Sequence, residues 1–362
     1  MVRVHEYVAR AGAAHSVNSA DRLRGLVRPL VSELLYTIFA VLVFPGLVFS
    51  ATLALFGEWF YRKATARMQN RMGPSYTGPL GLLQPLADLL KLLLAKEVKK
   101  QKYSSTLLAE VGLGISIASV IASMLLLPIS PVRLSAPYDV IVLVYLYAVW
   151  HFTGILLAVL AYPNPFVIAG LSRLIALTVV VEPVVFGSIL VPMVVLTPHC
   201  DLPYSVTCAA TNSWRAWLAS PLSFASMALA LLSMIVATQA KLGLKPFDIP
   251  EAEQELIAGH MTEFSGSVLA LYNLSHDVKF AFSAILITYV FIGGPYPYRH
   301  LSFEGAALLI VKFLVVLFVL TWVRASYGRR RIEQGIALVM KYGLLPSIIA
   351  LILAFTHAAL FG

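Results

Sequence analysis

Five carboxylates are concentrated in one polar stretch, KLGLKPFDIPEAEQELIAGHMTEFSG, at residues 241–266. The whole chain has only 18 acidic residues, and those in this stretch are Asp248, Glu251, Glu253, Glu255 and Glu263. Carboxylates crowded in a partly desolvated pocket have raised, coupled pKa values, so they take up and release protons near neutral pH. The pattern favours a proton relay over a transition-metal site, because His260 is the one histidine or cysteine nearby.

Part of this stretch also has a structural interpretation. Asp248, Pro250 and Glu251 fit the start of a helix, with an N-cap residue, a proline in the first turn and a capping-box acid. Glu251 and Glu255 would share a helix face, where like charges repel each other. Asp248 and Glu251 therefore suit capping, and the stronger relay candidates are Glu253, Glu255 and Glu263.

The composition identifies the class of protein that contains these carboxylates. Hydrophobic residues make up 59% of the 362 residues and charged residues 12%, with a mean hydropathy of +0.83. Soluble domains average about 45–50% apolar and about 25% charged residues. Apolar runs of about 20 residues, enough to cross roughly 30 Å of hydrocarbon, recur along the chain. We expect an all-α polytopic membrane protein, whose net charge of +9 reflects membrane orientation rather than nucleic-acid binding.

Eight apolar segments are predicted to form transmembrane helices in a single domain that covers residues 31–362. They lie at about 34–57, 105–127, 139–161, 174–196, 221–240, 266–292, 304–323 and 341–361. Residues 1–30 contain five arginines and no apolar core, so we expect a short amphipathic or disordered extension rather than a signal peptide.

Basic residues orient these helices in the membrane. The connections after the first, third, fifth and seventh helices, with the start of the eighth, hold 17 lysines and arginines, whereas the other connections hold three. Positively charged connections stay cytoplasmic, so the segments 58–104 and 241–265 are predicted to face the cytoplasm. The five N-terminal arginines then lie outside, against the rule, but the difference between the connections outweighs them.

The two cysteines of the chain, Cys200 and Cys208, share one predicted external connection. A disulfide between them would persist on that side of the membrane and would stabilise the loop by roughly 2–4 kcal/mol. Two free thiols are the alternative. A metal site that adds His199 and Asp201 is less favoured, because no second ligand cluster supports it.

A second unusual stretch, RMGPSYTGPLGLLQPLADLLKLLLAKE, covers residues 71–97. Its turn signals are Gly73-Pro74 and Gly78-Pro79, and the absence of a Gly-Lys-Ser/Thr sequence excludes a phosphate loop. From Leu80 the pattern is helical, with a narrow polar stripe of Gln84, Asp88 and Lys91. The stripe and the lysines that follow favour an interfacial helix over a ninth span. Asp88 and Lys91 also suit a simple i, i+3 ion pair.

Ionisable side chains inside the predicted spans are costly in lipid and are therefore candidates for function. Glu182 lies in the fourth helix, and Arg173 lies nine residues earlier, near the membrane entry. The sixth helix carries His276, Asp277 and Lys279. Asp277 and Lys279 point apart on a helix, so their partners must come from other helices. Asp139 begins the third helix, close enough to the interface to be solvated.

The stretches at 71–97 and 244–266 closely resemble the two signature stretches of the family of complex I membrane subunit 1, also called the H subunit. That family includes the homologous membrane subunit of energy-converting nickel-iron hydrogenases. The order of the eight spans agrees as well, so the resemblance covers about residues 30–360. It implies a subunit without chemistry of its own, which anchors the peripheral electron-transfer arm. In complex I such a subunit forms much of the quinone chamber and begins the chain of carboxylates that feeds the ion pumps.

The resemblance also implies roles for single residues. Relay or chamber residues would be Arg173, Glu182, Glu251, Glu253, Glu255 and Glu263, with Asp139 and Asp88 as further members. Asp277 is a relay candidate because it is an ionisable residue inside the sixth helix. Residues 73–79 would shape the contact with the peripheral arm, beside Arg71, Gln84, Lys91 and Asp248. No cofactor is expected in this chain. The implied partners in the cell membrane are redox subunits with Fe–S clusters, in some members a nickel-iron centre or quinone, and antiporter-like pumps.

Two departures from complex I favour the hydrogenase-like branch. The sixth helix has Ser275-His276-Asp277 where complex I members usually have a run like Ala-Glu-Tyr, and Glu182-Pro183 is more similar to the hydrogenases. A quinone-chamber subunit of an NADH:quinone oxidoreductase is the alternative.

Two other classes of protein fit the sequence less well. A stand-alone transporter should show internal repeats with matching broken helices, and the two halves of the chain show none. A membrane cytochrome needs paired histidines, whereas His151, His276 and His357 are single.

Overall fold

The computed structural model describes residues 33–99, 101–130, 134–251, 253–298 and 302–361, without the side chains of 253 and 254. Regular structure in these ranges is entirely helical, which confirms the predicted all-α class. The N-terminal extension predicted at 1–30 lies outside the described residues.

Seven helical stretches in these ranges are long and apolar enough to cross a membrane. The helices that form them are α3 (Leu47–Met68), α5 (Thr106–Leu125), α6 (Asp139–Val144) with α7 (His151–Leu160), α8 (Pro165–Leu196), α10 (Pro221–Lys241), α13 (Phe303–Ser326), and α14 (Ile332–Val339) with α15 (Leu345–Phe361). A π-helical segment joins α6 to α7, and another joins α14 to α15. The first stretch begins at Glu33, before α3.

The remaining predicted span forms α12 (Gly266–Val290), which is not among those seven because of its composition. Its 25 residues extend about 37 Å at 1.5 Å per residue, long enough to cross a bilayer. Its first half carries His276, Asp277 and Lys279, and its second half is almost wholly buried. Polar residues are tolerated here because α12 packs against α3, α5 and α13 rather than lipid.

Several helices are longer than their apolar runs. α3 continues past the predicted end at 57 to Met68, because Glu58 and Arg62 pair one turn apart on it. α8 begins at Pro165 rather than 174, because Asn164 caps it by accepting from the Phe166 amide. The predicted external connection at 197–220 contains a further helix, α9 (Val206–Leu218).

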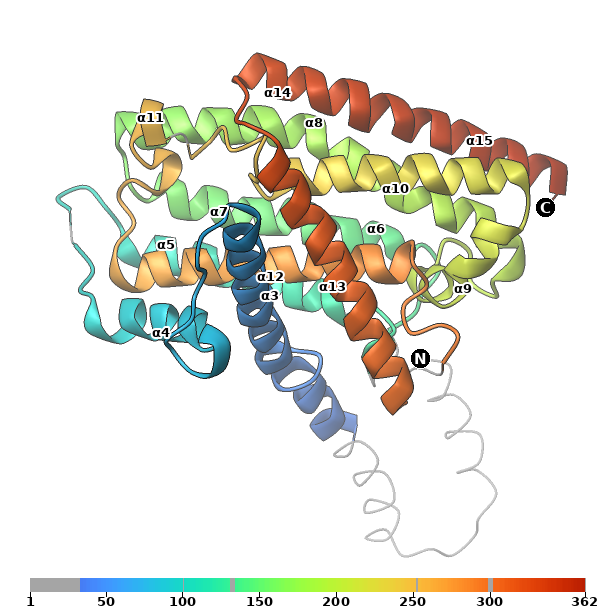
Figure 1. The fold of residues 1–362 in the computed structure, drawn as a ribbon, viewed down its shortest axis with the longest axis horizontal. Helices are drawn as coiled ribbons and strands as arrows, with labels where there is room; N and C mark the ends of the chain where they lie inside the picture. Colours follow the sequence, from blue (N-terminus) through green and yellow to red (C-terminus); the bar gives the residue numbers. More distant parts are fainter. Residues whose placement is uncertain (1–32, 100, 131–133, 252, 299–301, 362) are drawn as a thin grey trace, which may run out of the picture.

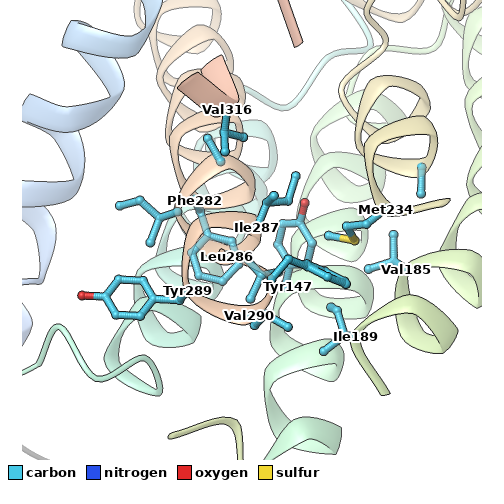
Figure 2. Close-up of a cluster of buried hydrophobic side chains, with 14 of the residues drawn as sticks. Tyr147, Val185, Ile189, Met234, Phe282, Leu286, Ile287, Tyr289, Val290 and Val316 are labelled. Atoms are coloured by element: carbon cyan, nitrogen blue, oxygen red, sulfur yellow. The ribbon is translucent and has the colours of Figure 1, made fainter. Parts of the chain in front are cut away.

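The helices form one bundle with two differently built ends. α4 (Gln84–Leu90) and the short α11 (Glu253–Leu256) lie at one end, whereas α9 and the C-terminus lie at the other (Figure 1). α3 and α13 cross the bundle obliquely. A core of aromatic and branched side chains joins α8, α10, α12 and the third span, with Tyr147, Met234 and Phe282 almost fully buried (Figure 2).

The α9 end of the bundle is held by a disulfide and a buried carboxylate. Cys200 and Cys208 are joined, with Cα atoms 6.0 Å apart. Asp139 is only 2% exposed and accepts from the Val206 amide at 2.6 Å and the Ser205 hydroxyl at 3.2 Å. A carboxylate at these positions satisfies free amides at the start of α9.

α5 and α7 touch through glycines. A Cβ added to Gly112 would lie 2.7 Å from the Gly154 carbonyl oxygen, and one added to Gly154 would lie 2.5 Å from that of Gly112. Small residues allow this close approach of backbones in membrane bundles.

We expect Gly154→Ala to lower the stability of the protein by roughly 1–3 kcal/mol, because the two backbones must separate. The measurement is the thermal unfolding midpoint in detergent. Gly114→Ala is the matched control, since a Cβ on Gly114 meets nothing within 4 Å. Equal midpoints for the two variants would contradict this account of the α5–α7 contact.

Candidate functional site

A cavity of about 350 Å³ opens between α3, α12, α13 and the polar stretch at 242–261. Its ionisable lining residues are Glu58, Tyr61, Arg62, Lys245, Asp248, Glu251, His276, Asp277 and Arg324. Four of these are carboxylic acids drawn from three separate parts of the sequence. The cavity is therefore a place where protons and charge can be shared between elements.

Arg62 ties this cavity to the interfacial helix. Its guanidinium binds Glu58 at 2.5 Å and Asp88 at 2.7 Å, and the Gln84 amide donates to Asp88 at 2.9 Å. The helix begins at Gln84 rather than Leu80, because Leu80 and Gly81 both have positive φ. The ion pair that we expected between Asp88 and Lys91 is not the one formed, since the guanidinium of α3 lies within reach of Asp88.

The turns at 73–81 are held against α3 by hydrogen bonds from side chains of that helix. Lys63 donates to the carbonyls of Pro74 at 2.7 Å and Leu80 at 3.0 Å, and the Trp59 indole donates to Leu80 at 3.2 Å. A second cavity of about 360 Å³, lined by Arg71, Met72, Gly73 and Pro74, shares Glu58, Tyr61, Arg62 and Arg324 with the first. The loop expected to contact a peripheral arm thus adjoins the acidic cavity.

A buried polar axis leads from the cavity into the bundle. His276 and Asp277 line the cavity, and His276 Nε2 lies 3.0 Å from the Leu242 carbonyl at the end of α10. On the other side of this end, the Lys241 ammonium pairs with Glu182 of α8 and lies 4.3 Å from the centre of the Tyr147 ring. Lys279 donates to the Lys241 carbonyl at 3.2 Å.

A side branch of this axis runs through hydroxyl groups. The Ser116 hydroxyl lies 2.8 Å from His151 Nδ1 and 2.7 Å from the Ser275 hydroxyl. His151 Nε2 and Glu182 Oε2 are buried without a hydrogen-bond partner among the described residues. Buried polar atoms of this kind are commonly satisfied by water.

Glu251 belongs to a hydrogen-bonded chain beside the cavity. The Tyr272 hydroxyl donates to Glu251 at 3.1 Å and lies 2.7 Å from His260 Nε2. Because the hydroxyl gives its proton to the carboxylate, Nε2 of His260 is the donor in the second bond. Gly170 of α8 lets this turn approach, since a Cβ there would collide with the His260 amide nitrogen.

We expect the segment 241–265 to lose stability below about pH 6.5. His260 is 1% exposed, and burial lowers its pKa below the ordinary 6.5. The neutral histidine therefore stabilises the fold fully above pH 6.5, and this contribution is lost as the pH falls through the lowered pKa. Hydrogen exchange of the segment between pH 7.5 and 5 measures the effect. His260→Gln keeps a donor without titrating, so an unchanged pH dependence in this variant would contradict the assignment.

Glu255 and Glu263 lie outside the cavity. Glu255 is exposed, and its hydrogen bond and ion pair with Arg173 lower its pKa below the ordinary 4.5; Arg329 lies 3.9 Å away. Glu263 accepts from the amides of Gln101 and Asn164, and so joins the two connections on either side of it.

The structure brings together only part of the predicted relay. Asp248, Glu251 and Asp277 meet in the cavity, and Glu182 lies further along the axis, whereas Arg173, Glu255 and Glu263 lie on the surrounding surface. Asp139 lies at the α9 end. The side chain of Glu253 is outside the described residues. Asp248 does not cap a helix, because α11 begins only at Glu253.

The site residues that were not predicted from the sequence include Glu58, Arg62 and Arg324. Arg62 and Arg324 were counted as connection charges, and Arg324 lies over the Tyr61 ring at 4.2 Å. The available signal was the i, i+4 spacing of Glu58 and Arg62, which predicts that the first helix continues through them.

A helical membrane protein with an acidic cavity at one end and a buried ion-paired axis is the class defined by this fold and site. The family profile described as NADH dehydrogenase matches residues 39–355. The H subunit of the NADH-quinone oxidoreductase of Brevibacillus brevis is 32% identical over 319 residues, which cover 87% of this chain and 90% of that protein. The corresponding protein of Paramagnetospirillum magneticum is 30% identical over 349 residues, which cover 94% and 98%.

The chain therefore belongs to the NADH dehydrogenase family of complex I membrane subunits, as its two signature stretches predicted. Its fold is also similar to a chain in a solved structure described as a membrane-bound sulfane sulfur reductase, an archaeal respiratory membrane complex. The TM-score is 0.68 at 23% identity, and the match covers 90% of this chain and 99% of that chain.

Proposed function

We propose that this chain is the membrane-anchor and ion-coupling subunit of a complex I-like respiratory complex in the cell membrane. Redox subunits with Fe–S clusters dock as a peripheral arm on the loop at 71–80, and antiporter-like subunits lie beside the bundle. The observation that carries the proposal is the continuity of the loop, the acidic cavity and the buried Lys241–Glu182 pair.

Coupling in this arrangement is electrostatic. Electron transfer in the arm changes charge or conformation beside the cavity, which Glu58, Glu251 and Asp277 line. These coupled carboxylates answer with a change in proton occupancy. The altered proton occupancy changes the field at His276 and then at the Lys241–Glu182 pair, which lies among the packed spans. Neighbouring pump subunits respond to that change by moving protons or sodium ions.

We favour a complex of the hydrogenase-like branch over one that passes its electrons to a membrane quinone. A quinone must enter the cavity from lipid, and the small pocket between α3, α4 and α12, which shares Arg62 and Asp277 with the cavity, has a volume of about 30 Å³. Arg62 and Asp88, joined by their ion pair, both line this pocket. Quinone entry by this route would require that ion pair to separate. A quinone-chamber subunit is therefore the second candidate function.

Purification from the native membrane in mild detergent tests the proposal. Redox subunits and antiporter-like subunits are expected to co-purify, and metal analysis should find iron and nickel in the complex. Quinone-reducing subunits without nickel would favour the second candidate. A chain that purifies without partners and transports an ion alone would be a stand-alone transporter, and the proposal would be wrong.

A further inference from the structure

Two lysines and one carboxylate meet where α8, α10 and α12 approach one another. The Lys241 side chain is 5% exposed and pairs with Glu182, whose side chain is 22% exposed. Lys279 of α12 is half-buried, and no carboxylate of the described residues lies at ion-pairing distance from its ammonium group. Within the described part of the chain, one of the two positive charges is thus paired with a carboxylate, and the other is not.

The Lys279 ammonium is held by the end of α10. Its Nζ atom donates to the Lys241 carbonyl at 3.2 Å, in the last turn of that helix, where the free carbonyls carry partial negative charge. His276 uses the next carbonyl, that of Leu242, at 3.0 Å. Backbone carbonyls stabilise a buried cation less than a carboxylate does. A lysine in such surroundings readily exchanges its proton, whereas an arginine stays charged.

The backbone that carries Lys279 is fixed. The Ser283 hydroxyl donates to the Lys279 carbonyl at 2.7 Å, so the Tyr147 hydroxyl, 2.6 Å away, donates to Ser283. The ring of Tyr147 also makes a cation–π contact with the Lys241 ammonium. The two lysines are therefore positioned by one shared set of contacts.

We propose that Lys279 is a proton carrier between the acidic cavity and Glu182, an inference that rests on the proposed coupling function. The N–H bond of its ammonium breaks with the electron pair left on nitrogen. Oε2 of Glu182, which has no hydrogen-bond partner among the described residues, forms the new O–H bond through a bound water. His276, which lies one helical turn before Lys279 and lines the cavity, returns a proton to the amine.

The transfer leaves the total charge of the cluster unchanged, because Lys279 and Glu182 become neutral together. When Glu182 becomes neutral, Lys241 keeps its own proton against the Tyr147 ring, and a cation over an aromatic face is favourable. His151 of α7 is a further titratable group in this region, and its Nε2 is buried without a partner in the described part of the bundle. The transferred proton is thus the one held by Lys279.

Substitutions at Lys279 in the intact complex separate a carrier from a fixed charge. Lys279→Arg keeps the charge and a donor but does not release a proton, and Lys279→Gln and Lys279→Met remove the charge. We expect each assembled variant to reduce electrogenic ion uptake in proteoliposomes by roughly tenfold or more, with electron transfer to an artificial acceptor retained. Lys312→Arg is the control, since Lys312 lies at the other end of α12, where it donates to the carbonyls of Ile292, Gly294 and Tyr296.

Ion uptake at the wild-type level in Lys279→Arg, Lys279→Gln or Lys279→Met would overturn the assignment, and normal uptake in the arginine variant alone would make Lys279 a fixed charge. Glu182→Gln distinguishes the carrier role of Lys279 from the coupling function. If Glu182→Gln stops ion uptake while the Lys279 variants do not, only the carrier assignment fails. If none of the variants affects uptake, the coupling function itself is wrong.

Discussion

Complexes that carry Glu182→Gln are expected to transfer electrons to an artificial acceptor while their ion translocation falls by roughly tenfold or more. Glutamine keeps the size of the side chain but does not ionise, so the axis loses the group that answers a charge change in the cavity. The measurement is ion uptake by proteoliposomes, normalised to the electron-transfer rate. Uptake at the wild-type ratio would contradict the role of Glu182.

The same substitution leaves Lys241 without its carboxylate. A buried charge that loses its partner typically costs about 3–5 kcal/mol of stability, and the ring of Tyr147 offsets part of this cost. Glu182→Gln combined with Lys241→Met removes both charges, so the double variant should regain stability without regaining ion uptake. Glu304→Gln, at the exposed start of α13, is the matched control for an acid outside the axis.

Arg62→Met is expected to reduce the yield of complex that retains its peripheral arm by roughly tenfold, which corresponds to about 1.4 kcal/mol of docking free energy. Arg62 joins Glu58, Asp88 and, through Asp88, the interfacial helix. The Glu58 side chain is 14% exposed and lines the same cavity as Asp277. In Arg62→Met it loses the cation that it binds, which is costly for a carboxylate so little exposed.

Arg62→Lys keeps one charge but cannot bind both carboxylates with a planar fork, so its loss should be intermediate. Arg67→Met, at an exposed position five residues along α3, should assemble normally. The measurement is the ratio of arm subunits to this chain after purification. Equal loss in the Arg62 and Arg67 variants would mean that general surface charge, rather than the bridge, holds the arm.

The spans were predictable because hydrocarbon demands long apolar helices, and this demand is visible residue by residue. Their ends were not, because charged residues such as Glu58 and Arg62 are compatible with a helix once they pair with each other. Apolar runs alone place the end of α3 at 57 and the start of α8 at 174. α9 was missed because it is a short helix held by contacts with Asp139 from another span.

The acids of the site were predictable, but their partners were not. Glu182 was visible as a costly charge in an apolar run, whereas its partner Lys241 lies 59 residues away and was counted as a connection charge. Helical periodicity shows which residues share a face, but it does not show which faces meet. For the same reason Glu255 and Glu263 were predicted to share a relay with Glu251, although of these three only Glu251 lines the cavity.

The most direct test of the coupling account is the number of ions moved per electron by the reconstituted complex with the double substitution Glu182→Gln and Lys241→Met. This variant removes both charges of the Lys241–Glu182 pair together, so neither is left without its partner, and we expect assembly and electron transfer to be retained. We expect the number of ions moved per electron to fall to near zero while the electron-transfer rate stays unchanged. A ratio equal to that of the wild-type complex would show that translocated ions do not depend on this axis.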